Sequence, residues 1–213
     1  MSAPVDEDWW QRTHGGSREK SSSLPIRVAF QGERGAYGDI AIDILWRSTA
    51  LPLPSWNFDD VLNAVRSGKC DYSVLPVENT VVGRIHVVCD ALAAAPTLVT
   101  LRDITIPIRH ALLAPPDARL DTVISVTSHP VALAQCQQFL RRHPHIIPHD
   151  SYDTAGAARD VAARGQRTEA AIAGIPASRR YDLRVLAEDI QDTTDNATRF
   201  VVIARAEYAG EES

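Results

Sequence analysis

The sequence has few of the residues that mark exported, membrane-bound or metal-holding proteins. Among 213 residues there are three cysteines, Cys70, Cys89 and Cys136, with no CxxC pair, so neither a disulfide framework nor a zinc site is predicted. No stretch approaches the roughly 18 apolar residues of a membrane span, and the opening MSAPVDEDWW lacks the apolar core of a signal peptide. We therefore expect a cytoplasmic protein with no membrane partner.

Positive charge is also scarce. The chain has 22 Lys and Arg against 27 Asp and Glu, a formal net charge of −5, and its basic residues form only isolated pairs such as Arg141-Arg142. Nucleic acid is therefore excluded as an expected partner. The hydrophobic content of 45% is enough for a buried core in one compact unit or two small lobes.

Residues 1–23 end in the run HGGSREKSSS, which has no apolar period, and this composition predicts a disordered N-terminal arm. Within it, the pair Trp9-Trp10 is a candidate for docking on the chain's own surface or on a neighbouring subunit. Residues 24–213 are predicted to form the folded part.

From Ile26 onward, short apolar runs alternate with helical periods, which is typical of βα units in a largely parallel α/β sheet. Strands are expected near 26–30, 53–57, 72–76, 122–128, 170–174 and 199–205. Helices are expected near 37–48, 58–67, 85–92, 129–140 and 175–181, with one more capped by Asp153 or Thr154. The run 97–114 reads as extended chain between two lobes. Because the last strand follows the second lobe, we place it in the first, which gives lobes of 26–103 plus 190–205 and of 104–189, with a ligand cleft between them.

Two polar segments follow the first and third strands. The backbone N–H groups of Gln31-Gly32-Glu33-Arg34-Gly35 are suited to hold an anion, although a tight turn needs the same glycines. Glu78, Asn79 and Thr80 follow a buried strand, where they either line a pocket or cap the next turn.

Two further polar segments lie in the second half of the chain. Ser128 precedes His129-Pro130, and Gln135 lies seven residues after it, which places both near one face of a continuous helix; a plain helix cap is the alternative for Ser128. Arg199 stands beside Thr198 before the last strand, where a planar two-pronged donor suits a carboxylate, unless it pairs with Asp192 or Asp195.

Three histidines, at 143, 145 and 149, lie in the Pro-punctuated segment HPHIIPHD. This composition is typical of a polar loop, and no metal site is predicted there.

In this order, VAFQGERGAYGDIA, VLPVENTVVGRIHVVCDAL, SHPVALAQC and DIQDTTDNATRFVVIAR resemble the motifs of the prephenate dehydratase catalytic domain, and the resemblance runs from about Arg27 to Arg205. It implies two lobes of periplasmic-binding-protein-like (type II) architecture with mixed sheets. It also implies a lyase that needs no cofactor or metal, acts on a small-molecule substrate and assembles as a homodimer or homotetramer.

The resemblance also implies roles for individual residues. Thr198 would assist departure of the ring hydroxyl of prephenate, with Arg199 and Asn79 as the other catalytic candidates. The substrate-binding candidates are Glu78, Thr80, Ser128, Gln135, Phe200, Gly35 and Tyr37.

The sequence departs from the family pattern in three places. Gly38 stands where Ser or Thr is usual, and Arg84 stands where a small residue is usual. Family members commonly continue into a phenylalanine-sensing ACT domain, whereas only eight residues, AEYAGEES, follow Arg205 here. We therefore expect no cooperative inhibition by phenylalanine.

Three alternatives stay open beside decarboxylating dehydration of prephenate to phenylpyruvate. DTAGAA and GRIH resemble members that use arogenate and form phenylalanine directly. A prephenate decarboxylase is disfavoured, because such proteins tend to lose the Glu-Asn and Thr-Arg-Phe motifs that this chain keeps. The third alternative is a non-catalytic binding protein for a small carboxylate with the same fold.

Overall fold

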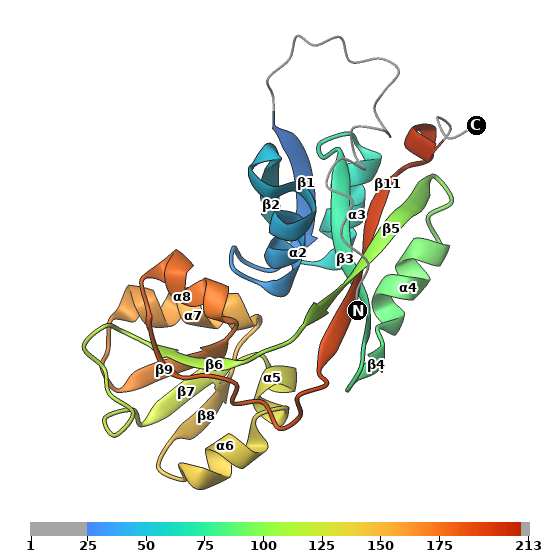
Figure 1. Cartoon of the computed structure of the whole chain (residues 1–213). Helices are drawn as coiled ribbons and strands as arrows, with labels where there is room; N and C mark the ends of the chain where they lie inside the picture. The colour runs from blue at the N-terminus through green and yellow to red at the C-terminus, as the bar shows by residue number, and fades with distance from the viewer. Residues whose placement is uncertain (1–24, 210–213) are drawn as a thin grey trace. The chain divides into compact units, whose positions relative to one another are not determined.

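The computed structural model describes residues 25–209, so the predictions for the N-terminal arm and for Trp9-Trp10 lie outside the described residues. The chain divides into two compact units. Within the described residues, unit 1 comprises 25–31, 41–105 and 199–209, and unit 2 comprises Gly32–Ile40 and Ile106–Thr198. Each unit has its own sheet with helices packed against it (Figure 1).

The sheet of unit 1 has the order β2-β1-β3-β11-β5, with β4 paired to β3. The strands are β1 (Ile26–Gln31), β2 (Ala50–Ser55), β3 (Tyr72–Asn79), β4 (Gly83–Arg84), β5 (Leu98–Pro107) and β11 (Ala197–Arg205). β1 runs parallel to both β2 and β3, and β4 is antiparallel to β3. The last strand therefore lies in the first sheet, between β3 and β5.

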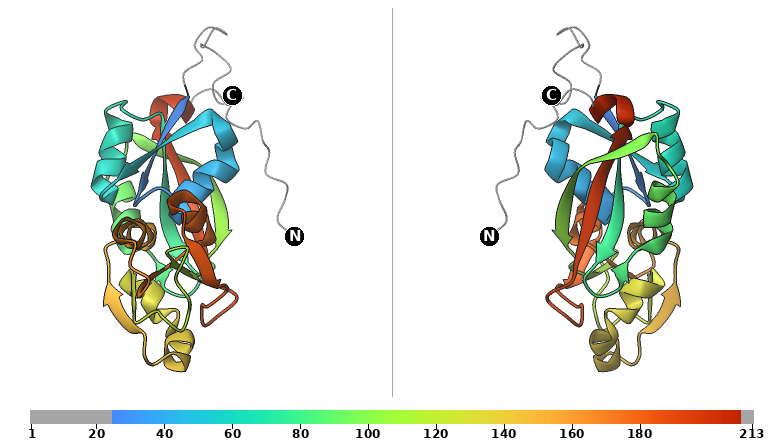
Figure 2. Two further views of the ribbon diagram at one scale, coloured as in Figure 1. Left: turned by 90° about the vertical axis from the view of Figure 1, so that its left-hand side faces the viewer. Right: turned by 90° about the vertical axis from the view of Figure 1, so that its right-hand side faces the viewer.

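Helices cover both faces of this sheet, because successive strand residues point to opposite sides and both sets are apolar. One face packs against α3 (Phe58–Arg66) and α4 (His86–Ala93) through a buried cluster that includes Ala29, Leu75, Val77 and Ile203. The helix α2 (Tyr37–Trp46) brings Trp46 to within 5.5 Å of the ring of Tyr72. Figure 2 shows α2 and α3 on opposite sides of the strands.

The sheet of unit 2 has the order β10-β6-β9-β7-β8. Its strands are β6 (Ala111–Ala114), β7 (Ser125–Ser128), β8 (Ile147–Asp150), β9 (Glu169–Ala173) and β10 (Arg184–Ala187). β7 is parallel to β8 and β9, whereas β6 is antiparallel to β9 and β10. The predicted mixed α/β class with two sheets is therefore confirmed.

The sheet of unit 2 is likewise covered on both faces. Leu112, Val126 and Ile172 belong to one buried cluster with residues of α5 (Pro130–Ala134) and α6 (Gln137–Arg142). The helices α7 (Thr154–Arg164) and α8 (Ile175–Tyr181) pack on each other, and α7 also packs on β9. Polar groups buried in this unit therefore lie in an apolar surrounding, which strengthens their interactions.

Residues 32–40 and 190–198 belong to unit 2, whereas the sequence predicts both segments in the first lobe. The reason for the first difference is a set of hydrogen bonds. The backbone N–H of Glu33 donates to Asp153 Oδ2 at 3.1 Å, and the Tyr181 hydroxyl donates to the carbonyl of Arg34 at 2.6 Å. The backbone around 108–110 similarly bonds residues 190 and 196. Because the residues joined by these hydrogen bonds are distant in sequence, a local sequence pattern cannot predict them.

Of the two caps that the sequence allows for α7, Asp153 or Thr154, the structure uses Asp153, whose carboxylate also binds a second segment. Its Oδ2 accepts from the N–H of Gly156 at 3.0 Å as well as from Glu33. Burial raises the pKa of the Asp153 carboxyl, against the effect of these N–H donors. A raised folded-state pKa means that the carboxyl's contribution to stability is full below its unfolded pKa and is lost as pH rises through the folded pKa.

We therefore predict that Asp153→Asn gains stability relative to the natural protein as pH rises from 3 to 7, because the amide oxygen still accepts both bonds without a buried charge. Asp153→Ala loses both bonds and should cost about 2 kcal/mol throughout. Thermal unfolding of the three proteins across this pH range is the measurement. A difference between Asp153→Asn and the natural protein that does not change with pH would contradict the prediction.

Some elements differ from those predicted. The HPHIIPHD loop contains the strand β8, which lies at the edge of its sheet and so tolerates Pro148. The predicted helix 129–140 is two helices, α5 and α6, and the extended run 97–114 is the two strands β5 and β6. β10 was not predicted. Among residues 25–209, no helix combines the length and apolar composition of a membrane span.

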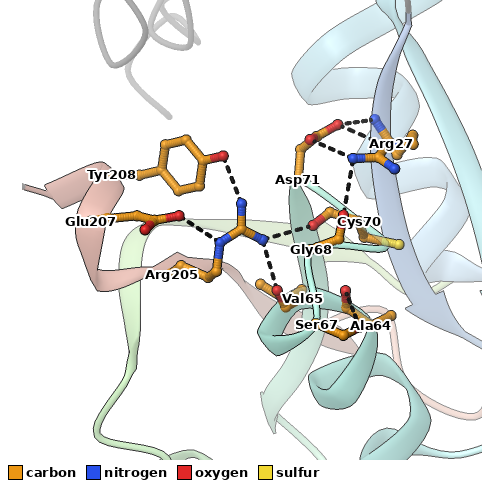
Figure 3. A network of polar contacts seen from close by, with 10 residues as sticks. All are labelled: Arg27, Ala64, Val65, Ser67, Gly68, Cys70, Asp71, Arg205, Glu207 and Tyr208. Carbon is orange, nitrogen blue, oxygen red and sulfur yellow. Dashed lines mark hydrogen bonds and ion pairs between the residues drawn. The ribbon is translucent and has the colours of Figure 1, made fainter.

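Arg205, at the end of β11, forms the centre of a polar network in unit 1 (Figure 3). Its Nη1 donates to the carbonyls of Val65 at 2.8 Å and Cys70 at 3.3 Å. Its Nη2 donates to the Tyr208 hydroxyl at 2.7 Å, and its Nε donates to Glu207 at 2.8 Å. The guanidinium thus joins the end of α3 to the short 3₁₀ helix Ala206–Ala209.

Arg205→Ala should lower the free energy of unfolding by about 2 kcal/mol, because the carbonyls of Val65 and Cys70 lose a charged donor. The matched control is Glu207→Ala, which removes the exposed ion pair alone and should cost less than about 0.5 kcal/mol. Urea unfolding of both variants measures these values. Equal losses would assign the effect to the surface ion pair instead.

Candidate functional site

The candidate site residues fall into two groups, one in each unit. Unit 2 contains Gly35, Tyr37, Ser128, Gln135 and Thr198. Unit 1 contains Glu78, Asn79, Thr80, Arg199 and Phe200.

Ser128 ends β7 and is fully buried. Its hydroxyl donates to the carbonyl of Ile172 on β9 at 2.6 Å. The cap of α5 is His129, whose side chain accepts from the N–H of Val131, so the cap interpretation of Ser128 is wrong. The serine oxygen keeps its acceptor capacity, while its proton is committed to the sheet.

Gln135 is the C-cap residue of α5 and not part of one helix with Ser128, so the helical-face argument that paired them does not apply. Its side chain is buried, and its Oε1 accepts from His110 Nε2 at 3.0 Å and from Asn196 Nδ2 at 2.9 Å. Its backbone carbonyl accepts from the N–H of Asp192 at 2.6 Å. Two residues distant in sequence therefore hold the side-chain amide, and a third holds the backbone of Gln135.

His110 contacts the candidate residue Gln135, and the sequence analysis did not identify it. It stands just before the buried strand β6 and is 3% exposed. Burial lowers the pKa of its imidazole, so the ring is neutral at pH 7. The only available signal was a polar pair, Arg109-His110, ahead of the apolar run ALLA, and that pair matches no motif.

Tyr37 and Gly35 are both engaged by their own unit. The Tyr37 hydroxyl donates to the carbonyl of Arg109 at 2.6 Å, and burial raises the pKa of the phenol. The Gly35 N–H donates to Asp39 Oδ2 at 2.7 Å. Because the amides of Gly35 and Glu33 are both occupied by carboxylates, the anion-binding interpretation of this turn is wrong for those two donors.

Asn79 ends β3 and caps the turn that follows. Its buried Oδ1 accepts from the N–H groups of Val81 and Val82, each at 3.0 Å. The turn-cap alternative is therefore confirmed for its side-chain oxygen. Thr80, in the turn itself, is exposed.

Arg199 pairs with Glu78, whose Oε2 accepts from Nη2 at 3.2 Å and from Nε at 3.3 Å. The predicted partner Asp192 instead accepts from the N–H groups of Gln137 and Gln138 at the start of α6. The two predicted site residues Arg199 and Glu78 are thus brought together as an exposed ion pair.

Thr198 and Phe200 are buried, whereas Arg199 between them is exposed. Consecutive strand residues project to opposite faces. Arg199 and the buried Thr198 therefore project to opposite faces of β11.

The two departures from the family pattern have clear positions. Arg84 lies on β4 directly opposite Glu78, which is also the partner of Arg199. Gly38 lies in the first turn of α2, beside Asp39, whose carboxylate holds the N–H of Gly35. The carboxylate of Asp39 thus provides a hydrogen bond at the start of the helix, where Gly38 offers no hydroxyl.

Within residues 25–209 no group of His, Cys, Asp and Glu side chains has the arrangement of a metal site. The three cysteines are free thiols. Burial raises the pKa of Cys136 to about 12, so this thiol is not a nucleophile at neutral pH.

Comparison with known proteins points to one family. A family model described as prephenate dehydratase matches residues 28–208. Arogenate dehydratase 2 of Petunia hybrida is 39% identical over 180 residues, which are 84% of this chain and 45% of that protein. Arogenate dehydratase/prephenate dehydratase 2, chloroplastic, of Arabidopsis thaliana is 37% identical over 185 residues, which are 87% of this chain and 48% of that protein. The chain spans about half the length of the curated relatives it matches.

Two solved structures resemble the chain closely. The prephenate dehydratase from Arthrobacter aurescens in complex with L-Phe has a TM-score of 0.78 and 30% identity, covering 84% of this chain and 60% of that one. A protein titled GqqA, a novel type of quorum quenching acylase, has a TM-score of 0.75 and 31% identity, covering 84% of this chain and 64% of that one.

Proposed function

Because this chain belongs to the prephenate dehydratase family, we propose that it catalyses the decarboxylating dehydration of prephenate to phenylpyruvate in phenylalanine biosynthesis. One observation carries the proposal beyond family membership. Three polar residues at the positions of the family motifs, Ser128, Gln135 and Thr198, are buried in unit 2 with exposed fractions of 0%, 8% and 7%. A buried polar side chain is costly unless it is hydrogen-bonded, and the amide N–H₂ group of Gln135 has no hydrogen-bond partner within residues 25–209, which supports a role in binding.

The reaction suits residues of this kind. When the ring carboxylate of prephenate leaves as CO₂, the electron pair of the broken C–C bond completes the aromatic ring and expels the hydroxyl group, which takes a proton and leaves as water. The protein has to orient the substrate, keep water away from the carboxylate and donate to the departing oxygen. We assign that last task to Thr198, as a hydrogen-bond donor or proton relay, because a threonine hydroxyl is too weak an acid to act alone.

The other candidate residues would bind the substrate. Gln135 offers its amide nitrogen and Ser128 its hydroxyl oxygen. Asn79 is the proposed contact in unit 1, with its side-chain oxygen already committed to the turn that follows. Arg199 would act on substrate only after exchanging its partner Glu78. Tyr37 would contribute its ring, since its hydroxyl is bonded to Arg109.

Phe200, Thr80 and Gly35 have weaker support as contacts. Phe200 is buried, and we propose that its ring packs under the substrate-binding residues of unit 1 and supports them. Thr80 is exposed in the turn after Asn79, from which it would reach a ligand directly. Gly35 would act through the close packing of its backbone, because its N–H is occupied.

Arogenate dehydration is the second candidate, and the names of the Petunia and Arabidopsis relatives favour it. The decisive experiment measures initial rates with each substrate, detecting phenylpyruvate by its absorbance in base and phenylalanine by chromatography. We expect a higher kcat/KM with prephenate. A higher value with arogenate would exchange the two candidates, and tight binding without turnover of either would establish the non-catalytic alternative.

Ser128→Ala should raise the KM for prephenate and also lower stability by about 1 kcal/mol, because the bond to the Ile172 carbonyl is lost together with the substrate contact. Thr122→Ala is the control, since that hydroxyl bonds only surface backbone of the same unit. A loss of stability with unchanged KM would remove Ser128 from the substrate site.

We also propose a homodimer or homotetramer and a cytoplasmic location. The free thiols support a reducing compartment, whereas the Arabidopsis relative is named chloroplastic. Sedimentation velocity and cell fractionation test these two proposals.

A further inference from the structure

The side chain of Gln135 has one hydrogen-bonding group in use and one open. A carboxamide oxygen has two lone pairs, and here both are occupied, by His110 Nε2 and Asn196 Nδ2. The Gln135 Nε2 has no hydrogen-bond partner within residues 25–209. It is also not one of the fully buried polar atoms that lack a partner in that part of the chain. The amide N–H₂ group is therefore the open end of this side chain.

His110 is committed to one tautomer by the same contact. An amide oxygen accepts and cannot donate, so the proton of the neutral imidazole must lie on Nε2. That leaves Nδ1 as a buried acceptor without a partner in the described residues. A leucine of similar size would fill the space without this cost, so the ring is not explained by packing.

Neighbouring contacts hold the backbone of His110 and border one side of its ring. The backbone N–H of His110 donates to Gln191 Oε1 at 2.8 Å, and the backbone carbonyl of His110 accepts from the N–H of Ile190. The ring of Tyr37 stands edge-on to the imidazole, with centroids 6.2 Å apart, and is held by the backbone of Arg109. An imidazole confined in this way directs its Nε2–H along one line, toward Gln135.

We propose that His110 is a positioning residue which, with Asn196, fixes the orientation of the Gln135 amide so that Gln135 binds the substrate only as a donor, to a carboxylate or keto oxygen. The proposal rests on the proposed function for the identity of the substrate. The hydrogen-bond arrangement itself does not depend on that identity. Without His110 the amide can rotate by half a turn and present its oxygen, which repels a carboxylate.

The first test reads the tautomer without any assay. In protein labelled with ¹⁵N-histidine, the His110 ring signals are assigned from the spectrum of His110→Gln. The Nε2–H tautomer is expected at neutral pH. An Nδ1–H tautomer would overturn the proposal even in a fully active enzyme, and the measurement keeps its meaning if neither prephenate nor arogenate is turned over.

The second test separates positioning from packing. His110→Leu should raise the KM for prephenate about tenfold, the loss expected for one of two bonds that orient the amide, with a smaller change in kcat. His110→Gln places an amide N–H near the former Nε2 and should restore KM to within about threefold, whereas His110→Asn reaches only the Nδ1 position and should behave like His110→Leu. Thermal unfolding is recorded for each variant. Equal KM values for His110→Gln and His110→Leu at matched stability would overturn the proposal.

The third test is a double-mutant cycle. If His110 acts through Gln135, His110→Leu should have no further effect on KM in a Gln135→Ala background, whereas additive effects would show an independent role. Gln135→Glu keeps both acceptor contacts but removes the N–H₂ group, so it should raise KM at least as much as Gln135→Ala. An unchanged KM in Gln135→Glu would mean that Gln135 does not serve as a donor.

Discussion

Thr198→Ala is expected to lower kcat for prephenate by about 100-fold or more while changing KM by less than about threefold, the range found when a positioned proton donor is removed. The hydroxyl is buried at the start of β11, where low polarity strengthens its hydrogen bond to an oxygen that gains charge as its bond breaks. An interaction that grows in the transition state affects turnover more than binding.

Thr198→Ser is the matched control, because it keeps the hydroxyl and should retain at least about a tenth of the turnover. Thr122→Ala, which removes a hydroxyl bonded to surface backbone, should leave kcat unchanged. Steady-state rates for the three variants, together with their thermal unfolding, are the measurements. If Thr198→Ala turns over prephenate at the normal rate, another group assists the departing hydroxyl.

Local patterns predicted several elements and one helix cap correctly. The cap Asp153, the helix 175–181 and the strand starting at Ile26 all follow from residue types within a few positions. Such features depend on hydrogen bonds between near neighbours and on the alternation of apolar side chains, both of which are visible in the sequence.

The break between α5 and α6 could not be predicted in this way. The periodic pattern continues through Gln135, but the N–H groups of Gln137 and Gln138 are capped by Asp192, 55 and 54 residues further along. A carboxylate from a distant segment thus starts a second helix. The broken helix also removes the reason for which Gln135 was paired with Ser128, although Gln135 is still held by a buried polar cluster.

The partners of the site residues were equally invisible. His110 and Asn196 reach Gln135 from 25 and 61 residues away, and Arg199 meets Glu78 from 121 residues away. The motif resemblance located Gln135 and Arg199 but carried no information on which of their atoms are occupied. The hydrogen bonds show that the side-chain oxygen of Gln135 is occupied and that Arg199 is paired with Glu78.

The last prediction concerns Gly35, whose role is steric. It has φ +90°, a conformation that side chains disfavour, and a Cβ at this position would lie 3.1 Å from the Cα of Ala177 in α8. Gly165, the left-handed C-cap of α7 in the same unit, has φ +61° and open space around it. The two glycines therefore separate backbone strain from backbone crowding.

Gly35→Ala should cost about 3 kcal/mol, because strain of about 1–3 kcal/mol adds to the displacement of α8, and Gly165→Ala should cost only about 1 kcal/mol. For a chain of this size these losses correspond to falls in Tm of about 6–12 °C and 2–4 °C. Gly35→Ala should also raise KM, because its displacement shifts Tyr37, which packs against His110 and so bears on the Gln135 amide. Calorimetry and steady-state kinetics on Gly35→Ala and Gly165→Ala are the measurements. Equal losses of stability in the two variants would show that the close approach of Gly35 to Ala177 does not constrain the backbone at Gly35.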